Sequence, residues 1–205
     1  MRGLHDYFRA VQYLIYSMFE RIRGLDFSLR DNSDMTGERH GYAMTSDGAM
    51  NNIANRVDFT GKSFLDIGSG KGRTLVQAMK HGALRADGVE YLEKLHQIAE
   101  RNIARLGLSS LCKSHCIDAL EFTRYGEYDL FFLFNPFEYE LYRQVIDVLF
   151  SQCSGVVKER HIVCYGDGDL SSIEKYEQAC QIYEGICPHR KNRLVIFKIS
   201  CDRDA

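Results

Sequence analysis

Apolar and polar positions repeat with two different periods along the chain. From residue 61 onward, short apolar runs typical of buried strands alternate with stretches whose apolar residues recur every three or four positions, as in helices. The runs predict strands at 63–67, 86–90, 112–117, 128–134 and 161–166. The stretches between them predict helices at 72–82, 92–107, 118–122, 139–153 and 170–179. This alternation favours a parallel sheet covered by helices on both faces.

The end of the chain departs from the alternation. Two strands are expected at 181–187 and 193–200, and only "PHRKN" separates them, so they form a hairpin without a crossover helix. The expected fold class is therefore α/β. We expect a three-layer αβα sandwich with a seven-stranded, mostly parallel sheet, an antiparallel terminal strand and additional N-terminal helices.

The first 60 residues have a different pattern. Apolar residues spaced by three and four predict one helix over 4–22 with a single apolar stripe. The stripe suits packing on the domain, and a dimer helix or a membrane-surface helix remain alternatives. A polar connection follows, and Thr45 or Ser46 is expected to cap a second helix that runs to about Arg56. We therefore expect an N-terminal helical or lid segment at 1–60 and one α/β domain at 61–205.

Composition excludes several classes of protein. The net charge of −2 and the hydrophobic content of 45% are ordinary for a globular domain and give no sign of a nucleic-acid or membrane partner. Seven cysteines without a C-x-x-C pair indicate reduced thiols. "CKSHC" (Cys112, His115, Cys116) lacks a second ligand pair, so no metal is expected. Because neither a signal peptide nor an apolar run approaching ~18 residues is present, we expect a cytoplasmic protein without a membrane span.

The stretch "FLDIGSGKGRTL" holds the strongest functional signal. Its glycines, Gly68, Gly70 and Gly72, directly follow a predicted strand, and glycine lets a backbone pass close to a ligand. A phosphate-binding P-loop is excluded because Gly72, and not a hydroxyl residue, follows Lys71. The dinucleotide fingerprint G-x-G-x-x-G is excluded because Arg73 stands where its last glycine belongs.

The spacing that is present, with Asp66 two positions before the first glycine, resembles motif I of the class I S-adenosylmethionine (SAM)-dependent methyltransferases. The resemblance implies that the loop binds SAM and releases S-adenosylhomocysteine. It also implies that the Asp66 carboxylate contacts the ammonium end of the cofactor, that Glu90 accepts hydrogen bonds from the ribose, and that Asp118 lies beside the adenine amino group. The implied cofactor-binding residues are Asp66, Gly68, Ser69, Gly70, Gly72, Glu90, Tyr91, Asp118 and Ala119.

Purely structural roles remain open for some of these residues. Glu90 could be an ordinary surface acid, Asp118 could cap the segment that follows it, and Asp66 could be satisfied by loop amides. Lys71 and Arg73 are expected to support the loop or the following helix and to take no part in chemistry.

The resemblance places the catalytic residues after the fourth strand of the domain. There Asn135, Pro136 and Phe137 form "NPF", which is similar to the [DNS]-P-P-[YF] motif of amino-group methyltransferases and to the corresponding motif of the non-SET protein-lysine methyltransferases. It implies a nitrogen acceptor, with protein lysine as the leading guess, oriented by the Asn135 side-chain carbonyl. Duplex DNA is disfavoured because the chain is slightly acidic and has no target-recognition domain.

Other loops are expected around the acceptor. "NPFEYE", "GDGDL" and "CPHRKNR" should reach the same edge of the sheet, and the segment with Glu38, His40 and Tyr42 could fold over the cofactor as a lid. Two alternative functions remain: a SAM-binding sensor that does not catalyse, and an NAD-dependent oxidoreductase.

Overall fold

The structure, a computed structural model, describes residues 17–18, 20, 22–28, 42–154, 158–188 and 191–200. Ser17, Met18, Glu20 and Ile22 are helical, and the remainder of the predicted helix at 4–22 lies outside the described residues. Among the described residues, no helix is both long and apolar enough to cross a membrane.

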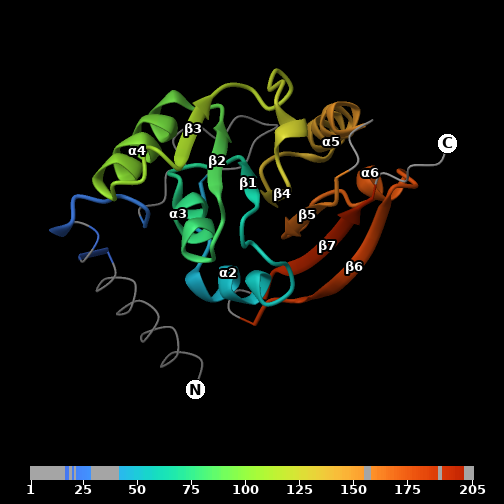
Figure 1. The fold of residues 1–205 in the computed structure, drawn as a ribbon, viewed down its shortest axis with the longest axis horizontal. Coiled ribbons are helices and arrows are strands. Elements are labelled where there is room, and N and C mark those ends of the chain that lie inside the picture. The colour runs from blue at the N-terminus through green and yellow to red at the C-terminus, as the bar shows by residue number, and fades with distance from the viewer. Residues whose placement is uncertain are drawn as a thin grey trace.

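Seven strands form a single sheet in the order β3-β2-β1-β4-β5-β7-β6 (Figure 1). Their bounds are β1 Ser63–Ile67, β2 Arg85–Glu90, β3 Cys112–Cys116, β4 Leu130–Phe134, β5 Arg160–Tyr165, β6 Ala179–Ile186 and β7 Arg193–Ile199. The strands from β3 to β5 pair in parallel, and β7 lies between β5 and β6, antiparallel to both. The predicted mostly parallel sheet with one antiparallel terminal strand is confirmed.

Helices cover both faces of this sheet. They are α2 Asp47–Ala54, α3 Arg73–Lys80, α4 Glu93–Arg105, α5 Tyr139–Cys153 and α6 Ser171–Glu174. Alternate strand residues point to opposite faces, so Phe64 packs with α2, α3 and α4, whereas Leu65 packs with α5 and α6. The result is the expected three-layer arrangement (Figure 1).

The start of α2 was predicted correctly. The Ser46 hydroxyl accepts a hydrogen bond from the Ala49 amide at 3.2 Å, which satisfies one of the amides that the first turn of a helix leaves without a partner. The helix ends at Ala54, close to the predicted end at Arg56.

The predicted helix at 118–122 is wrong, because these residues form a turn. The Asp118 carboxylate accepts a hydrogen bond from the Leu120 amide at 3.0 Å, and the Asp118 carbonyl accepts one from Glu121 at 3.0 Å. A short acidic side chain that bonds the backbone two residues ahead stabilises a turn in place of a helix. Between β3 and β4, where every residue is described, the only helical residues form a 3-10 turn at Tyr125–Glu127.

The predicted helix at 170–179 is too long. In the structure α6 ends at Glu174, and β6 begins at Ala179, which pairs with Ile199 of β7. The Tyr176 ring stacks on Phe150 of α5 with ring centroids 3.8 Å apart. Sheet pairing and this aromatic contact override the helix-like spacing of the segment, because tertiary packing outweighs local propensity.

Burial predicts which substitutions destabilise the fold. Ile146 of α5 is 0% exposed within the core under one sheet face. We expect Ile146→Ala to lower the free energy of unfolding by about 2–5 kcal/mol, because the cavity it leaves cannot fully collapse. Gln144→Ala, on the exposed side of the same helix, should change it by less than about 0.5 kcal/mol. Urea denaturation measures both, and equal losses would contradict the assigned core.

Candidate functional site

The strand register brings the predicted site residues to one edge of the sheet. In parallel pairing, Asp66 of β1 lies beside Gly88 of β2, and Ile67 lies beside Leu133 of β4. The segments that follow β1, β2 and β4 therefore leave the sheet side by side, at the carboxyl ends of their strands. Ligands of open α/β sheets bind at this edge.

The glycine loop is held in a conformation that favours glycine. Gly68, Gly70 and Gly72 have φ angles of 84°, 53° and 78°. A Cβ atom at Gly68 would lie 2.7 Å from Cβ of Pro136, and one at Gly72 would lie 3.1 Å from Cβ of Ala99 in α4. The loop is therefore packed tightly between the end of β4 and α4. Side chains at Gly68 or Gly72 would prevent this packing.

Tyr42 lies directly on the loop. A Cβ atom at Gly70 would be 2.3 Å from the Tyr42 ring, and the Tyr42 hydroxyl donates a hydrogen bond to the carbonyl of Phe27 at 2.7 Å. Burial raises the pKa of this hydroxyl far above its ordinary value, and Arg73 offsets part of the rise. Of the predicted lid residues, Tyr42 is thus in contact with the glycine loop, whereas Glu38 and His40 lie outside the described residues.

Glu90 joins the end of β2 to the same loop. Its carboxylate accepts hydrogen bonds from the Gly70 amide at 2.7 Å and from the Leu92 amide at 2.8 Å, and the residue is 7% exposed. Glu90 is therefore not an ordinary surface acid. A carboxylate can accept about four hydrogen bonds, so these two amide donors are compatible with further donors from a ribose.

Asp66 is buried beneath the loop at the end of β1. Its carboxylate accepts a hydrogen bond from the hydroxyl of Thr74, in the first turn of α3, and not from loop amides as one alternative held. Burial raises its pKa to about 7; the Thr74 hydrogen bond opposes this rise, and the Glu90 charge adds to it. A buried acid with such a pKa can hold or release a proton near neutral pH.

Ser69 also contributes a buried polar atom. A Cβ atom at Gly88 would lie 2.3 Å from its hydroxyl oxygen, so the hydroxyl is directed toward β2. Among the described residues this oxygen has no hydrogen-bond partner. The hydroxyl therefore packs between the loop and β2, and the cofactor contact implied for Ser69 stays a prediction.

The segments after β2 and β3 complete the edge. Tyr91 is 51% exposed directly after Glu90. Asp118 follows β3 and bonds the Leu120 amide, whereas Ala119 is buried and its carbonyl accepts a hydrogen bond from Tyr125 at 2.8 Å. Asp118 thus has the capping role considered as an alternative, and the adenine contact implied for it stays a prediction.

The "NPF" segment lies between two loops. Asn135 has a φ angle of 41°, and its side-chain carbonyl accepts a hydrogen bond from the Asp167 amide at 2.6 Å. A Cβ atom at Gly166 would lie 2.2 Å from this oxygen, so glycine is required there. Phe137 is half-buried and packs against the core beneath α5. The end of β4 is therefore tied to the end of β5.

The two cations of the glycine loop fasten the N-terminal segment to it. The Lys71 ammonium makes an ion pair with Asp26 at 2.8 Å. The Asn102 amide of α4 bonds the Lys71 carbonyl at 3.1 Å, and it also donates to and accepts from the backbone of Asp26 at 3.0 Å. Both cations support the loop, as predicted, but their partners lie in a segment that the sequence did not connect to it.

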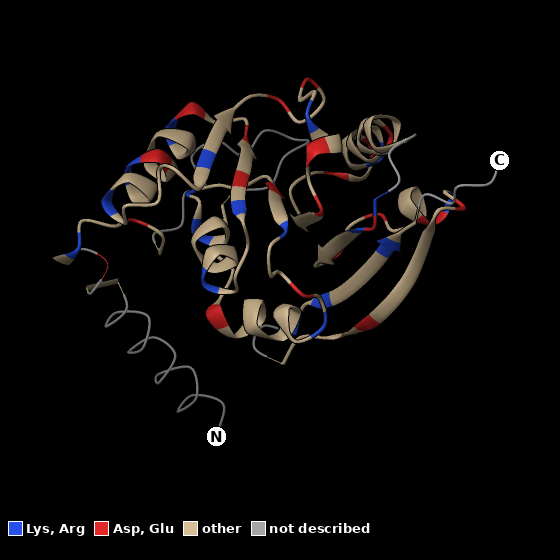
Figure 2. Ribbon diagram, viewed as in Figure 1, with Lys and Arg blue, Asp and Glu red and all other residues tan. Residues whose placement is uncertain are grey.

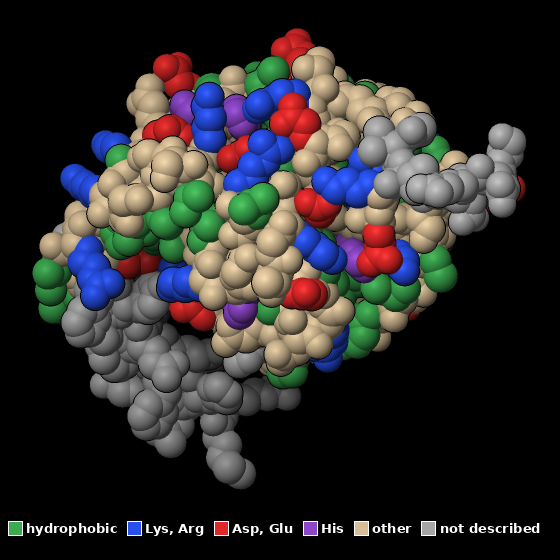
Figure 3. Space-filling view, viewed as in Figure 1, with side chains coloured by type: hydrophobic (Ala, Val, Ile, Leu, Met, Phe, Trp, Pro, Cys, Tyr) green, Lys and Arg blue, Asp and Glu red, His purple; other side chains and the backbone are tan. Residues whose placement is uncertain are grey.

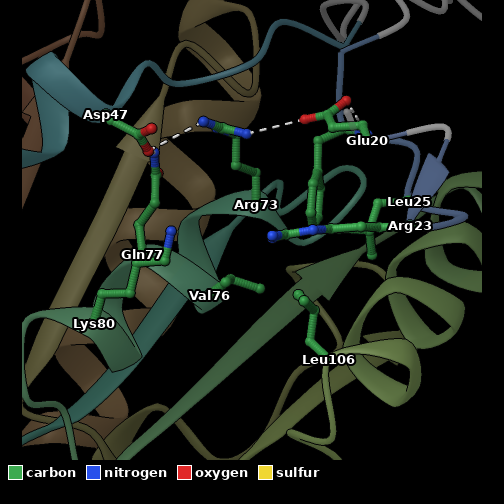
Figure 4. A pocket seen from close by; sticks show the side chains of 10 residues that line it. Glu20, Arg23, Leu25, Asp47, Arg73, Val76, Gln77, Lys80 and Leu106 are labelled. Atoms are coloured by element: carbon green, nitrogen blue, oxygen red, sulfur yellow. Dashed lines mark hydrogen bonds and ion pairs between the residues drawn. The ribbon is translucent and has the colours of Figure 1, made fainter. Parts of the chain in front are cut away.

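Arg73 makes the second attachment. Its guanidinium pairs with Glu20 at 3.2 Å and with Asp47 at 3.0 Å, and it donates to the Thr45 carbonyl at 3.0 Å (Figure 4). Glu20 in turn accepts hydrogen bonds from two backbone amides, those of Phe27 and Ser28. Sequence reasoning missed Glu20, Asp26 and Asn102, because the burial of the two cations, which makes partners necessary, is visible only in the structure.

These features fit SAM. The left-handed glycines bring the backbone close to the ligand edge, and Glu90 suits ribose hydroxyls. The ammonium contact implied for Asp66 stays a prediction.

Comparisons with known proteins support this assignment. A family model described as a methyltransferase domain matches residues 64–160. No curated protein sequence matches the chain.

Solved structures share the fold. An RNA methyltransferase from Salinibacter ruber in complex with S-adenosyl-L-homocysteine superposes with a TM-score of 0.63 at 18% identity, over 79% of this chain and 98% of that one. A tRNA methyltransferase from B. subtilis gives 0.60 at 21% identity, over 76% and 66%. Magnesium protoporphyrin IX methyltransferase from Synechocystis with bound SAM gives 0.58 at 16% identity, over 76% and 77%.

Gly70 of the glycine loop and Gly61, which precedes β1, offer a matched pair of substitutions. Gly61 and Gly70 both have positive φ angles, but a Cβ atom at Gly61 meets nothing within 4 Å, whereas one at Gly70 overlaps Tyr42. Gly61→Ala should cost about 1 kcal/mol of unfolding free energy through backbone strain alone. Gly70→Ala should cost a further ~1–3 kcal/mol because the Tyr42 ring is displaced.

Urea denaturation of both variants measures this difference. The double variant Gly70→Ala with Tyr42→Ala should show a coupling energy that removes most of the additional loss. Equal losses at Gly61 and Gly70 would contradict the contact between the loop and Tyr42.

The raised pKa of Asp66 predicts a pH dependence of stability without cofactor. Between its ordinary value of 3.8 and about 7, the folded protein keeps a proton on Asp66 that the unfolded chain releases. The contribution of Asp66 to stability is therefore full below pH ~4 and falls as pH rises to ~7, by up to ~1.4 kcal/mol per unit. Asp66→Asn stays neutral, so its unfolding free energy should fall less over this range. Parallel pH profiles for the two proteins would refute the assignment.

Proposed function

Because a methyltransferase-domain model matches residues 64–160 and SAM-dependent methyltransferases share the fold, we propose that the chain is a class I methyltransferase that methylates a nitrogen atom, with protein lysine as the acceptor. SAM supplies, when bound, a methyl group on a sulfonium, whose leaving group is already good. The work of the protein in such a reaction is to align the acceptor and to exclude water.

The contact between Gly68 and Pro136 is the observation that carries this proposal. A Cβ atom at Gly68 would lie 2.7 Å from that of Pro136, so the "NPF" segment is in direct contact with the first glycine of the cofactor loop. Asn135 precedes Pro136 at the end of β4. An acceptor held at Asn135 is therefore next to the loop that binds the methyl donor.

Asn135 is the residue to which we assign acceptor positioning. Its side-chain carbonyl is held in one direction by the Asp167 amide at 2.6 Å. A carbonyl oxygen has two lone pairs, so the second can accept a hydrogen bond from an amine and direct the nitrogen lone pair toward the donor. In this role Asn135 orients the acceptor and does not itself exchange protons.

The charges near Asn135 favour a cationic acceptor chain. Glu138 and Asp167 are both exposed, on the segments that follow β4 and β5, and they carry the negative charge here because Asp169 is neutralised by Arg143 at 2.6 Å. A negative edge attracts a lysine side chain and repels nucleic-acid phosphates. On the described part of the face in view, basic and acidic side chains are interspersed and form no basic stripe (Figures 2 and 3).

Label transfer from methyl-labelled SAM tests the acceptor class. The purified protein is incubated with separate protein, RNA and small-molecule fractions of a cell lysate. We expect label in protein, recovered as N-methyl-lysine after hydrolysis and mass spectrometry. Label confined to RNA would replace protein lysine by an RNA acceptor, and label confined to small molecules would exclude both. Binding of SAM without transfer to any fraction would favour the alternative of a non-catalytic sensor.

A variant at Asn135 tests its assigned role. Asn135→Gly removes the side chain without backbone strain, because glycine adopts the φ angle of 41° freely. Transfer should fall by about 10²-fold through loss of acceptor alignment. The Kd for S-adenosylhomocysteine, measured in parallel as the control, should change by less than about threefold. Full transfer activity in this variant would remove Asn135 from the acceptor site.

A further inference from the structure

A cavity lies on the side of α3 that faces away from the sheet. Its volume is about 190 Å³, and α3, the end of α4, the start of α2 and the N-terminal segment enclose it (Figure 4). Leu75 and Ala78 of α3 pack into the core under the sheet, so the helical spacing directs Arg73, Val76 and Gln77 outward to line this cavity.

The floor of the cavity is apolar. Leu25, Phe27 and Val76 form a small buried cluster, against which Leu106 at the end of α4 packs. Figure 4 shows Val76 and Leu106 next to each other on one side of the cavity. An apolar surface enclosed in this way suits a small aliphatic or thioether group.

Gln77 is a buried member of the cavity wall. The residue is 3% exposed, and its amide nitrogen donates to Asp47 at 2.7 Å and to the Thr45 carbonyl at 3.3 Å. Two acceptors at the nitrogen fix the orientation of the amide, so the oxygen faces the other way. Among the described residues, that buried oxygen has no hydrogen-bond partner. It is also shielded from solvent, so the acceptor within reach of a ligand is the half-exposed Asp47 carboxylate that Gln77 holds in place.

Charges of both signs border the same space. Asp47 and Glu20 contribute carboxylates, and Arg73 bridges them. Arg23 and Lys80 add two further cations, and Figure 4 shows the Arg23 side chain extending across the cavity. A ligand that carries both an ammonium and a carboxylate would find a complementary group for each.

From these groups we infer that the cavity binds a free α-amino acid with an apolar side chain. The ammonium pairs with the Asp47 carboxylate, the carboxylate faces Arg23 and Lys80, and the side chain packs on the apolar floor. A volume of about 190 Å³ is below the ~300–1,000 Å³ of pockets for drug-sized ligands and suits a molecule of this size. The residues that line the cavity do not include Asn135, Glu90 or the loop glycines, so its occupancy does not depend on the proposed acceptor.

Calorimetric titration of the whole chain with L-leucine and with L-methionine tests the inference. We expect at least one of them to bind. For the amino acid that binds, the analogue without the ammonium (4-methylpentanoate for leucine) and the amide without the carboxylate should each bind at least about tenfold more weakly, because each loses one charged contact. Absence of binding by both amino acids, or equal affinity for the analogues, would overturn the proposal.

Two variants place the binding in this cavity. Arg23→Ala should weaken binding about tenfold, whereas Arg101→Ala, an exposed arginine of α4 outside the cavity, should leave it unchanged. Val76→Phe should abolish binding by filling the floor, with circular dichroism confirming that this variant folds. Undiminished binding in Arg23→Ala and in a folded Val76→Phe variant would refute the site.

Discussion

Two buried positive charges, Lys71 in the glycine loop and Arg73 at the start of α3, attach the ligand edge to the N-terminal segment. Lys71 and Arg73 are almost fully buried, and removing such charges from water costs several kcal/mol each unless they are paired and hydrogen-bonded. Their partners, Asp26, Glu20 and Asp47, all precede the first strand. This earlier part of the chain therefore stabilises the loop and the start of α3.

The same loop contacts both the end of β2 and the segment after β4. Glu90 holds it from the side of β2 through the Gly70 amide, and Pro136 packs against Gly68 from the side of β4. Tyr42, fixed by its hydrogen bond to Phe27, covers the middle of the loop. The proposed donor and acceptor regions thus both contact one short stretch of backbone, so we expect changes in the loop to affect both binding of the cofactor and alignment of the acceptor.

Much of this architecture could be predicted from the sequence because strand burial and strand order leave periodic signals. The glycine spacing and the acid at the end of β2 likewise indicated the cofactor. The pairing of Lys71 with Asp26, and of Asn135 with the Asp167 amide, could not be predicted, because no spacing rule relates residues so far apart in the chain. The turn at Asp118 and the early start of β6 were missed because a side-chain hydrogen bond and sheet pairing override helical periodicity.

Calorimetric titration of the intact chain with S-adenosylhomocysteine and, separately, with NAD tests the central claim, that the loop at Gly68–Gly72 is a SAM site. The account predicts one site per chain for S-adenosylhomocysteine and no binding of NAD, because Arg73 replaces the third glycine of the dinucleotide pattern. Binding of NAD without binding of S-adenosylhomocysteine would contradict it.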